Sequence, residues 1–251
     1  MSRRDDYRAT LRGLGDWEAY LLAESGLPGP RGNIELAQAV ADEGDEALFR
    51  HLLAFDAERA PTNTPQEFLA FCGVVGLGQL AADGRRDLLP VLRQHANDPR
   101  WRMREGVAMA LQRWGQVDMN GLLTKMALWT QGSFLEQRAA AAALCEPALL
   151  RDPAHVEGTL QILDAITASI AEATDRRSEA FQALRKGLAY CWSVAVAALP
   201  ERGKPMMERW LASEDRDVRW IMRQNLAKQR LIRCDASWVA DSLSRLAGQK
   251  S

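Results

Sequence analysis

Apolar residues recur at intervals of three and four along most of the chain, which is the spacing of one face of an α-helix. The clearest case is the segment that opens at Asp152 and Pro153, because Leu160, Leu163, Ile166 and Ile170 fall on one such face. Alternating apolar and polar residues bounded by turn signals, which mark strands, are missing, and β-branched residues are sparse compared with Ala and Leu. The pattern predicts an all-α protein of about ten to thirteen helices joined by short connectors.

Capping residues predict where several of these helices begin. Thr64 and Glu67 have the spacing of a capping box, with Pro65 at the first helical position, so we expect a helix over 68–82. Glycines weaken a helix by about 1 kcal/mol each relative to alanine. Three of them lie in this segment, and we expect them to permit close contact with a neighbouring helix: Gly73, Gly76 and Gly78.

Further start and stop signals follow along the chain. Ser133 and Glu136 repeat the capping-box spacing ahead of an alanine-rich helix. The segment that opens at Asp152 is expected to run to 173, and another helix is expected over 179–199, ended by Pro200 and Gly203. Two loops are predicted, over 27–32 and 60–63.

Two distant segments share one pattern. Each has an apolar helix, then an acidic turn, then a second helix, and a weaker third copy lies between them, from Leu122 to Leu144. The matched positions align without a gap: Trp101, Met103, Arg104, Glu105, Val107 and Ala108 with Trp220, Met222, Arg223, Gln224, Leu226 and Ala227. The spacings leave room for units of about 40 residues. A repeated helical hairpin is therefore predicted.

The segment from Asp98 to Gly115 resembles the second half of a HEAT repeat, in which a turn Asp precedes a hydrophobic–Arg pair, here Met103 and Arg104. The resemblance implies a right-handed α-solenoid of about five to six hairpins. We expect residues 61–251 to form this stack and residues 1–60 to form an N-terminal helical cap. In HEAT proteins the Asp and Arg commonly form a ladder between successive turns, and the matching residues here are Asp98, Arg104, Asp217 and Arg223.

Composition narrows the class of protein. With 47% hydrophobic and 26% charged residues, the 251-residue chain matches a folded globular protein. No apolar run is long enough for a membrane span, and the first residues are polar where a secretory signal is apolar, so a cytoplasmic location and no membrane partner are predicted. The four cysteines lie far apart without metal-ligand spacing and are expected to be buried thiols, although a non-local disulfide stays open: Cys72, Cys145, Cys191 and Cys234.

Charge is unevenly distributed along the chain. Residues 1–84 carry seven Lys and Arg against fourteen Asp and Glu, whereas residues 85–251 carry twenty-five against nineteen. Such asymmetry can orient a partner, although ordinary scatter over solvated helix faces explains it equally well. The candidate partner-binding residues are the arginines and tryptophans expected on the second helices: Arg102, Arg113, Arg177, Arg185, Trp192, Arg219, Trp220 and Arg230.

These observations favour a non-enzymatic interaction protein that binds a protein or peptide partner in a concave groove. The alternative is a nucleic-acid-binding protein, because arginines with nearby tryptophans suit phosphate contacts combined with base stacking. The chain is also similar in size, helical content and abundance of Trp and Arg to the alkylpurine DNA glycosylases built from HEAT-like repeats. Their Trp–Asp pair at one-turn spacing has no clear counterpart, the nearest being Trp238 with Asp241.

No catalytic constellation is recognisable in the sequence. The three histidines are well separated and lack any metal-binding arrangement, and the glycine-rich run at 73–78 lies in an apolar helix without the strand that a dinucleotide site requires. We therefore assign no catalytic, metal-binding or cofactor-binding residues. Any enzymatic activity would follow from the glycosylase resemblance alone.

Overall fold

The computed structural model describes residues 2–248, and within that range about 75% of the chain is helical and no strand occurs. The prediction of an all-α protein is therefore confirmed. Fifteen α-helices and two short 3-10 turns are found in this range, more than the ten to thirteen expected. The excess comes from short helices such as α2 (Glu18–Ala23) and α14 (Gln229–Cys234), which are too short for a periodic pattern to reveal.

The chain divides into two compact units, residues 1–117 and 118–251. The predicted boundary at residue 60 falls inside the first unit. Helices of the expected N-terminal cap pack directly on the long helix that follows it, α5 (Pro65–Ala82). A separate cap over residues 1–60 stays a prediction.

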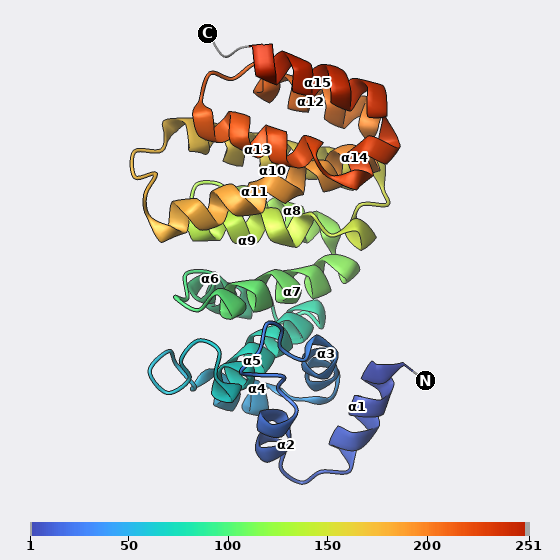
Figure 1. Ribbon diagram of the computed structural model, residues 1–251. Coiled ribbons are helices and arrows are strands. Elements are labelled where there is room, and N and C mark those ends of the chain that lie inside the picture. The colour runs from blue at the N-terminus through green and yellow to red at the C-terminus, as the bar shows by residue number, and fades with distance from the viewer. Residues whose placement is uncertain (1, 249–251) are drawn as a thin grey trace. The chain divides into compact units, whose positions relative to one another are not determined.

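In the first unit, α5 is the central helix, and α2, α3, α4 and α7 all pack against it (Figure 1). Its sequence is apolar on every side, which suits a helix surrounded by others. The remaining helices of this unit are α1 (Arg3–Arg12), α3 (Ile34–Glu43), α4 (Glu46–Leu53), α6 (Leu89–His95) and α7 (Trp101–Val117), with a 3-10 turn, η1, at Arg86–Leu88.

Glycines let α5 approach its neighbours closely. A Cβ added at Gly78 would lie 2.3 Å from the Cα of Ala110 in α7, and one added at Gly76 would lie 2.3 Å from the ring of Phe49 in α4. Real Cβ atoms do not come so close to other atoms. The expected packing role of these glycines is confirmed.

The second unit is built from helical hairpins that pack in two layers. Helices α8, α10 and α12 contact one another in sequence order, and α9, α11, α13 and α15 do the same (Figure 1). The helices of this unit are α8 (Met119–Trp129), α9 (Phe134–Leu144), α10 (Pro153–Glu172), α11 (Glu179–Ala198), α12 (Pro200–Leu211), α13 (Arg216–Leu226), α14 and α15 (Ala236–Gly248), with a 3-10 turn, η2, at Pro147–Leu149.

Helix boundaries follow the capping residues closely. The amide of Glu67 donates to the Thr64 hydroxyl, and Ser133 caps α9 in the same way. The predicted end at Pro200 is correct for α11, but Gly203 lies inside α12, which Pro200 opens. A Cβ added at Gly203 would come within 2.7 Å of the Cα of Val196 in α11, so the lack of a side chain at Gly203 lets α12 pack closely on α11.

The cysteines follow the prediction at three of four positions. Cys72, Cys145 and Cys191 are free and buried, and burial raises the pKa of the Cys72 and Cys145 thiols well above its usual range. Cys234 is free but exposed, so its predicted burial is wrong. It is the last residue of the short helix α14, whose only buried side chain is that of Leu231.

None of the described helices has the length and apolar character needed to cross a membrane.

Candidate functional site

A hollow lies in the second unit, along the first two turns of α13. Its volume is about 640 Å³, and α13 supplies most of its charged lining because residues three, four and seven apart share one helix face. Its lining residues are Gln182 and Arg185 from α11, Glu214 from the preceding turn, and Arg216, Asp217, Arg219, Trp220 and Arg223 from α13.

Asp217 is the most heavily engaged residue of this hollow. Its buried carboxylate lies 2.8 Å from Nε of Arg185, 2.9 Å from Nη1 of Arg176 and 3.5 Å from Nε of Arg216. Arg176 also pairs with Asp215 at 2.6 Å, and this hydrogen bond raises the pKa of Arg176 above its usual value. Asp217 therefore links α13 to the hairpin before it and has little capacity for another cation.

Trp220 is half-buried at the side of the hollow. The guanidinium carbon of Arg185 lies 3.7 Å from the centre of its ring, a cation–π contact that covers one face. That face is unavailable for stacking with any other group. Arg185 is in turn held by Asp217, so these three residues form one fixed wall.

The remaining arginines differ in how far they are neutralised. Arg219 donates to the backbone carbonyl of Leu246 at 2.7 Å, which ties it to α15. Arg216 has an 81% exposed side chain and only the long contact to Asp217. The side chain of Arg223 makes no ion pair or hydrogen bond with any residue in 2–248. Four arginines face two carboxylates around the hollow, which gives its lining a formal charge of +2.

Three predicted partner-binding residues thus line one hollow, namely Arg185, Arg219 and Trp220, and two residues assigned to the ladder, Asp217 and Arg223, lie there with them. Arg216 lines the same hollow. It belongs to the run of basic residues near the C-terminus, and its spacing of three and seven residues from Arg219 and Arg223 places it on the same face of α13.

Other predicted binding residues lie in the protein interior. Trp192 is fully buried, and its indole N–H donates to the Thr167 hydroxyl at 2.9 Å. Arg102 is 6% exposed and binds the buried carboxylate of Glu67 at 3.1 Å and the carbonyl of Gly29 at 2.7 Å. Neither side chain is open to a partner, so we remove both from the candidate site.

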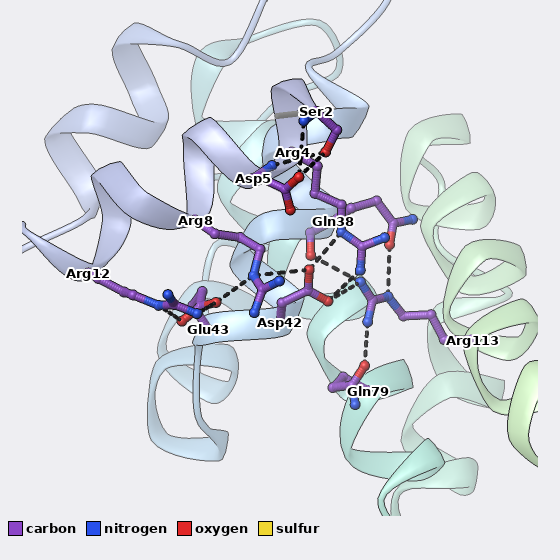
Figure 2. A network of polar contacts seen from close by, with 10 residues as sticks. All are labelled: Ser2, Arg4, Asp5, Arg8, Arg12, Gln38, Asp42, Glu43, Gln79 and Arg113. Carbon is purple, nitrogen blue, oxygen red and sulfur yellow. Dashed lines mark hydrogen bonds and ion pairs between the residues drawn. The ribbon is translucent and has the colours of Figure 1, made fainter.

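Arg113 belongs to a polar network in the first unit that holds α1 in place (Figure 2). It is 7% exposed and binds Asp42 at 2.8 Å and the side-chain oxygen of Gln38 at 2.8 Å. Asp42 also accepts from Arg4 of α1 at 2.6 Å, and Glu43 pairs with Arg8 and Arg12 of α1 at 2.5 and 2.7 Å. The role of Arg113 in the structure is to anchor this network, and it is removed from the candidate site for the same reason.

The last two predicted binding residues lie outside the hollow. Arg177 is exposed in the turn before α11. Arg230 donates to the Tyr190 hydroxyl and lies 4.4 Å from the centre of that ring. The Trp238 indole donates to Glu208 at 2.7 Å, and Lys204 lies 5.4 Å from its ring, whereas Asp241 is exposed. Neither Trp238 nor Asp241 lines the hollow along α13.

The predicted Asp–Arg ladder takes different forms in the two matched segments. In the first unit, Asp98 pairs with Arg100 at 2.8 Å, and Arg104 donates to the carbonyls of Asp98 and Pro99 at 2.9 and 3.0 Å. In the second unit, Asp217 joins neighbouring hairpins through Arg176 and Arg185. Trp101 is the first residue of α7, whereas Trp220 lies one turn inside α13, so the aligned positions differ in their distance from the helix start.

A second, smaller cavity occurs in the first unit. Its volume is about 200 Å³, and the rings of Phe68, Phe71 and the 44% exposed Trp101 line it. Arg102 stacks on Trp101 with its guanidinium carbon 4.3 Å from the ring centre.

Comparison of the chain with protein-family models, with curated proteins and with solved structures gives no match.

Proposed function

We propose that this chain is a non-enzymatic interaction protein that binds an acidic segment of a partner protein in the hollow along α13. The observation that carries the proposal is the pair of incompletely neutralised guanidinium groups, Arg216 and Arg223, in a hollow whose lining has a formal charge of +2. Guanidinium groups bind carboxylates through paired, charge-assisted hydrogen bonds. A carboxylate-bearing segment is the simplest occupant for such a lining.

The lining also supports a binding role over a catalytic one. It contains glutamine, arginine, tryptophan and two carboxylates, and no serine, cysteine, histidine or lysine that would serve as nucleophile or general base. Asp217 is committed to Arg176 and Arg185. Glu214 is exposed at the rim of the hollow.

The same geometry favours a peptide over a nucleic acid. Arg185 covers one face of Trp220, which removes that face as a platform for base stacking. Two open guanidinium groups offer far fewer phosphate contacts than the six to ten or so that a strongly DNA-binding surface provides. The alternative of a DNA-binding or alkylation-repair-like protein draws its support from the same arginines and Trp220, and from the resemblance to HEAT-like glycosylases.

The wider architecture stays a proposal as well. The right-handed HEAT-like stack of five to six hairpins is proposed from the sequence resemblance, and the two-layer packing of successive hairpins in the second unit supports a stack of hairpins. A cytoplasmic location is proposed together with this role. These proposals do not affect the test of the hollow.

Binding of a short glutamate-rich peptide to the full chain tests the proposed function. We expect saturable binding that weakens at least about ten-fold in the double variant Arg216→Gln with Arg223→Gln, because each removed guanidinium group loses a charge-assisted contact. Arg233→Gln is the matched control, since Arg233 is an exposed arginine of α14 outside the hollow. Equal binding by the double variant and the control would reject the hollow as the site.

Duplex and single-stranded oligonucleotides form the second arm of this experiment. The peptide proposal predicts that they bind more weakly than the peptide at matched charge and salt. Tighter oligonucleotide binding that is lost in the same double variant would support the nucleic-acid alternative and overturn the peptide proposal.

A further inference from the structure

The two open arginines of the hollow are separated by a fixed distance along α13. Arg216 and Arg223 are seven residues apart, so their Cα atoms lie about 10.5 Å apart along the helix axis and on the same face. Trp220 lies between them on that face, with Arg185 stacked on it. The hollow therefore presents two positive ends and an aromatic middle.

This spacing discriminates among peptide conformations. In a β-strand, side chains on one face are separated by about 6.6 or 13 Å, neither of which matches. A partner helix reaches this spacing only over two full turns, with charges seven residues apart. A polyproline II helix has three residues per turn and a rise of about 3.1 Å, so residues i and i+3 share a face about 9.3 Å apart.

We propose that the hollow recognises an acidic segment in the polyproline II conformation, with carboxylates at positions i and i+3. The segment Glu-Pro-Pro-Glu is the simplest example. One carboxylate pairs with Arg216 and the other with Arg223, and the intervening residues lie against Trp220, as proline-rich segments do in other aromatic-lined grooves. This inference rests on the proposed function and adds the conformation and charge spacing of the partner.

Glu214 sets a limit on how acidic the segment can be. Its carboxylate lines the hollow two residues before Arg216, and it makes no ion pair or hydrogen bond with any residue in 2–248. A third acid next to it would meet a like charge, which disfavours binding. Two spaced carboxylates therefore fit the hollow better than a continuous acidic run.

Peptides of identical composition and different charge order test the inference on the full chain. A proline-rich peptide with the core Glu-Pro-Pro-Glu is compared with one carrying Glu-Glu-Pro-Pro, and both are checked for polyproline II content by circular dichroism. An alanine-based helical peptide with glutamates seven residues apart is the third ligand. Dissociation constants are measured by fluorescence anisotropy at low salt.

We expect the Glu-Pro-Pro-Glu peptide to bind at least about ten-fold more tightly than either of the others. Of the two proline-rich peptides, only it places both charges opposite Arg216 and Arg223, and unlike the helical peptide it brings prolines against Trp220. Arg216→Gln and Arg223→Gln should each abolish this preference, and Arg233→Gln should preserve it. Equal affinity for the two proline-rich peptides would overturn the spacing inference and leave the proposed function standing. Tightest binding of the helical peptide would overturn the polyproline II conformation, whereas no binding of any acidic peptide would reject the proposed function itself.

Discussion

Arg102 and Glu67 form an ion pair whose energy is dominated by burial. Glu67 is fully buried, and its carboxylate accepts from the amide of Asn63 at 2.7 Å and from Arg102 at 3.1 Å. Arg102 also donates to Gly29 and Asn63, so the pair connects α5 and α7 to two loops. Removing one partner from such a pair costs much more than replacing both by apolar side chains.

We therefore expect Glu67→Gln to lower the free energy of unfolding by about 3 kcal/mol or more, because the Arg102 charge then stays buried without a carboxylate. The double variant Glu67→Leu with Arg102→Met should recover much of this loss. Urea titration followed by circular dichroism measures both. A double variant less stable than Glu67→Gln would contradict the argument from burial.

Gly78 makes a second prediction at the residue scale. Alanine would gain about 1 kcal/mol of helix propensity over glycine. Its Cβ, however, would lie 2.3 Å from the Cα and 2.6 Å from the carbonyl oxygen of Ala110, both backbone atoms that cannot rotate away. We expect Gly78→Ala to be destabilising by about 1–3 kcal/mol in a urea titration, as overpacking usually is.

Gly158→Ala is the control for this prediction. Gly158 also lies inside a helix, α10, but the nearest atoms to an added Cβ belong to the side chain of Leu123, at 3.0 Å and beyond. Because a leucine side chain can adjust, this variant should be close to neutral. A similar loss of stability in both variants would show that the backbone contact with Ala110 is unimportant.

The sequence does not distinguish arginines that are buried in the interior from arginines that are open to a partner. Arg102, Arg113 and Arg223 each lie in a helix next to a Trp or Met residue, yet the first two are buried against Glu67 and Asp42 and the third is open. Their acidic partners lie 35 and 71 residues away in the chain. No local pattern reports such a distant contact.

At the scale of elements, α1 is attached mainly through charged contacts. Only Tyr7 and Leu11 of this helix are buried, and three of its four arginines, Arg4, Arg8 and Arg12, bind Asp42 and Glu43 at the end of α3 (Figure 2). Burial alone would raise the pKa of Asp42, but hydrogen bonds from Arg4 and Arg113 outweigh it and lower that pKa below its usual value. Hydrogen bonds from Arg12 and Arg8 likewise lower the pKa of Glu43.

These shifts predict an acid-sensitive attachment of α1. Since the folded-state pKa values lie below the unfolded values of about 4, the stabilisation is complete above that pH and is lost as the pH falls through the folded-state values. Amide hydrogen exchange of residues 3–12, corrected for the intrinsic rate, should therefore accelerate below about pH 4. Asp42→Asn should remove much of this pH dependence by weakening the attachment already at neutral pH.

Asp87→Asn is a matched control, because Asp87 is a carboxylate of the same unit that pairs with Arg85 and makes no contact with α1. It should leave exchange in residues 3–12 unchanged. If exchange there were independent of pH in the unmodified chain, the network would not be what holds α1.

The presence and the ends of the long helices were the features most predictable from the sequence. The long helices α5, α10 and α11 begin at the predicted capping residues and end within one or two residues of the predicted positions. Capping is a local interaction, so it is visible in sequence. Short helices such as α2 and α14 depend on packing against neighbours, and local signals did not reveal them.

For the whole molecule, charge decides which partner class is favoured. Residues 1–117 carry 14 Lys and Arg against 17 Asp and Glu, and residues 118–251 carry 18 against 16, so the unit that contains the hollow has a net charge of +2. The sequence revealed the acidic-to-basic gradient but not that several of the basic side chains of this unit pair with its own carboxylates. The structure shows that Asp217 binds Arg176 and Arg185, whereas the side chain of Arg223 is open.

This distribution predicts a shallow salt dependence for DNA binding that uses the hollow alone. Two open guanidinium groups neutralise about two phosphates, so the logarithm of the association constant should fall with the logarithm of salt concentration with a slope of about −2. Affinity would then drop about ten-fold between 50 and 200 mM salt, whereas a surface making six to ten phosphate contacts loses roughly 10³–10⁵-fold. A titration with a duplex oligonucleotide distinguishes the two, and a slope of about −6 or steeper would mean that DNA binds basic side chains beyond the two open arginines of the hollow.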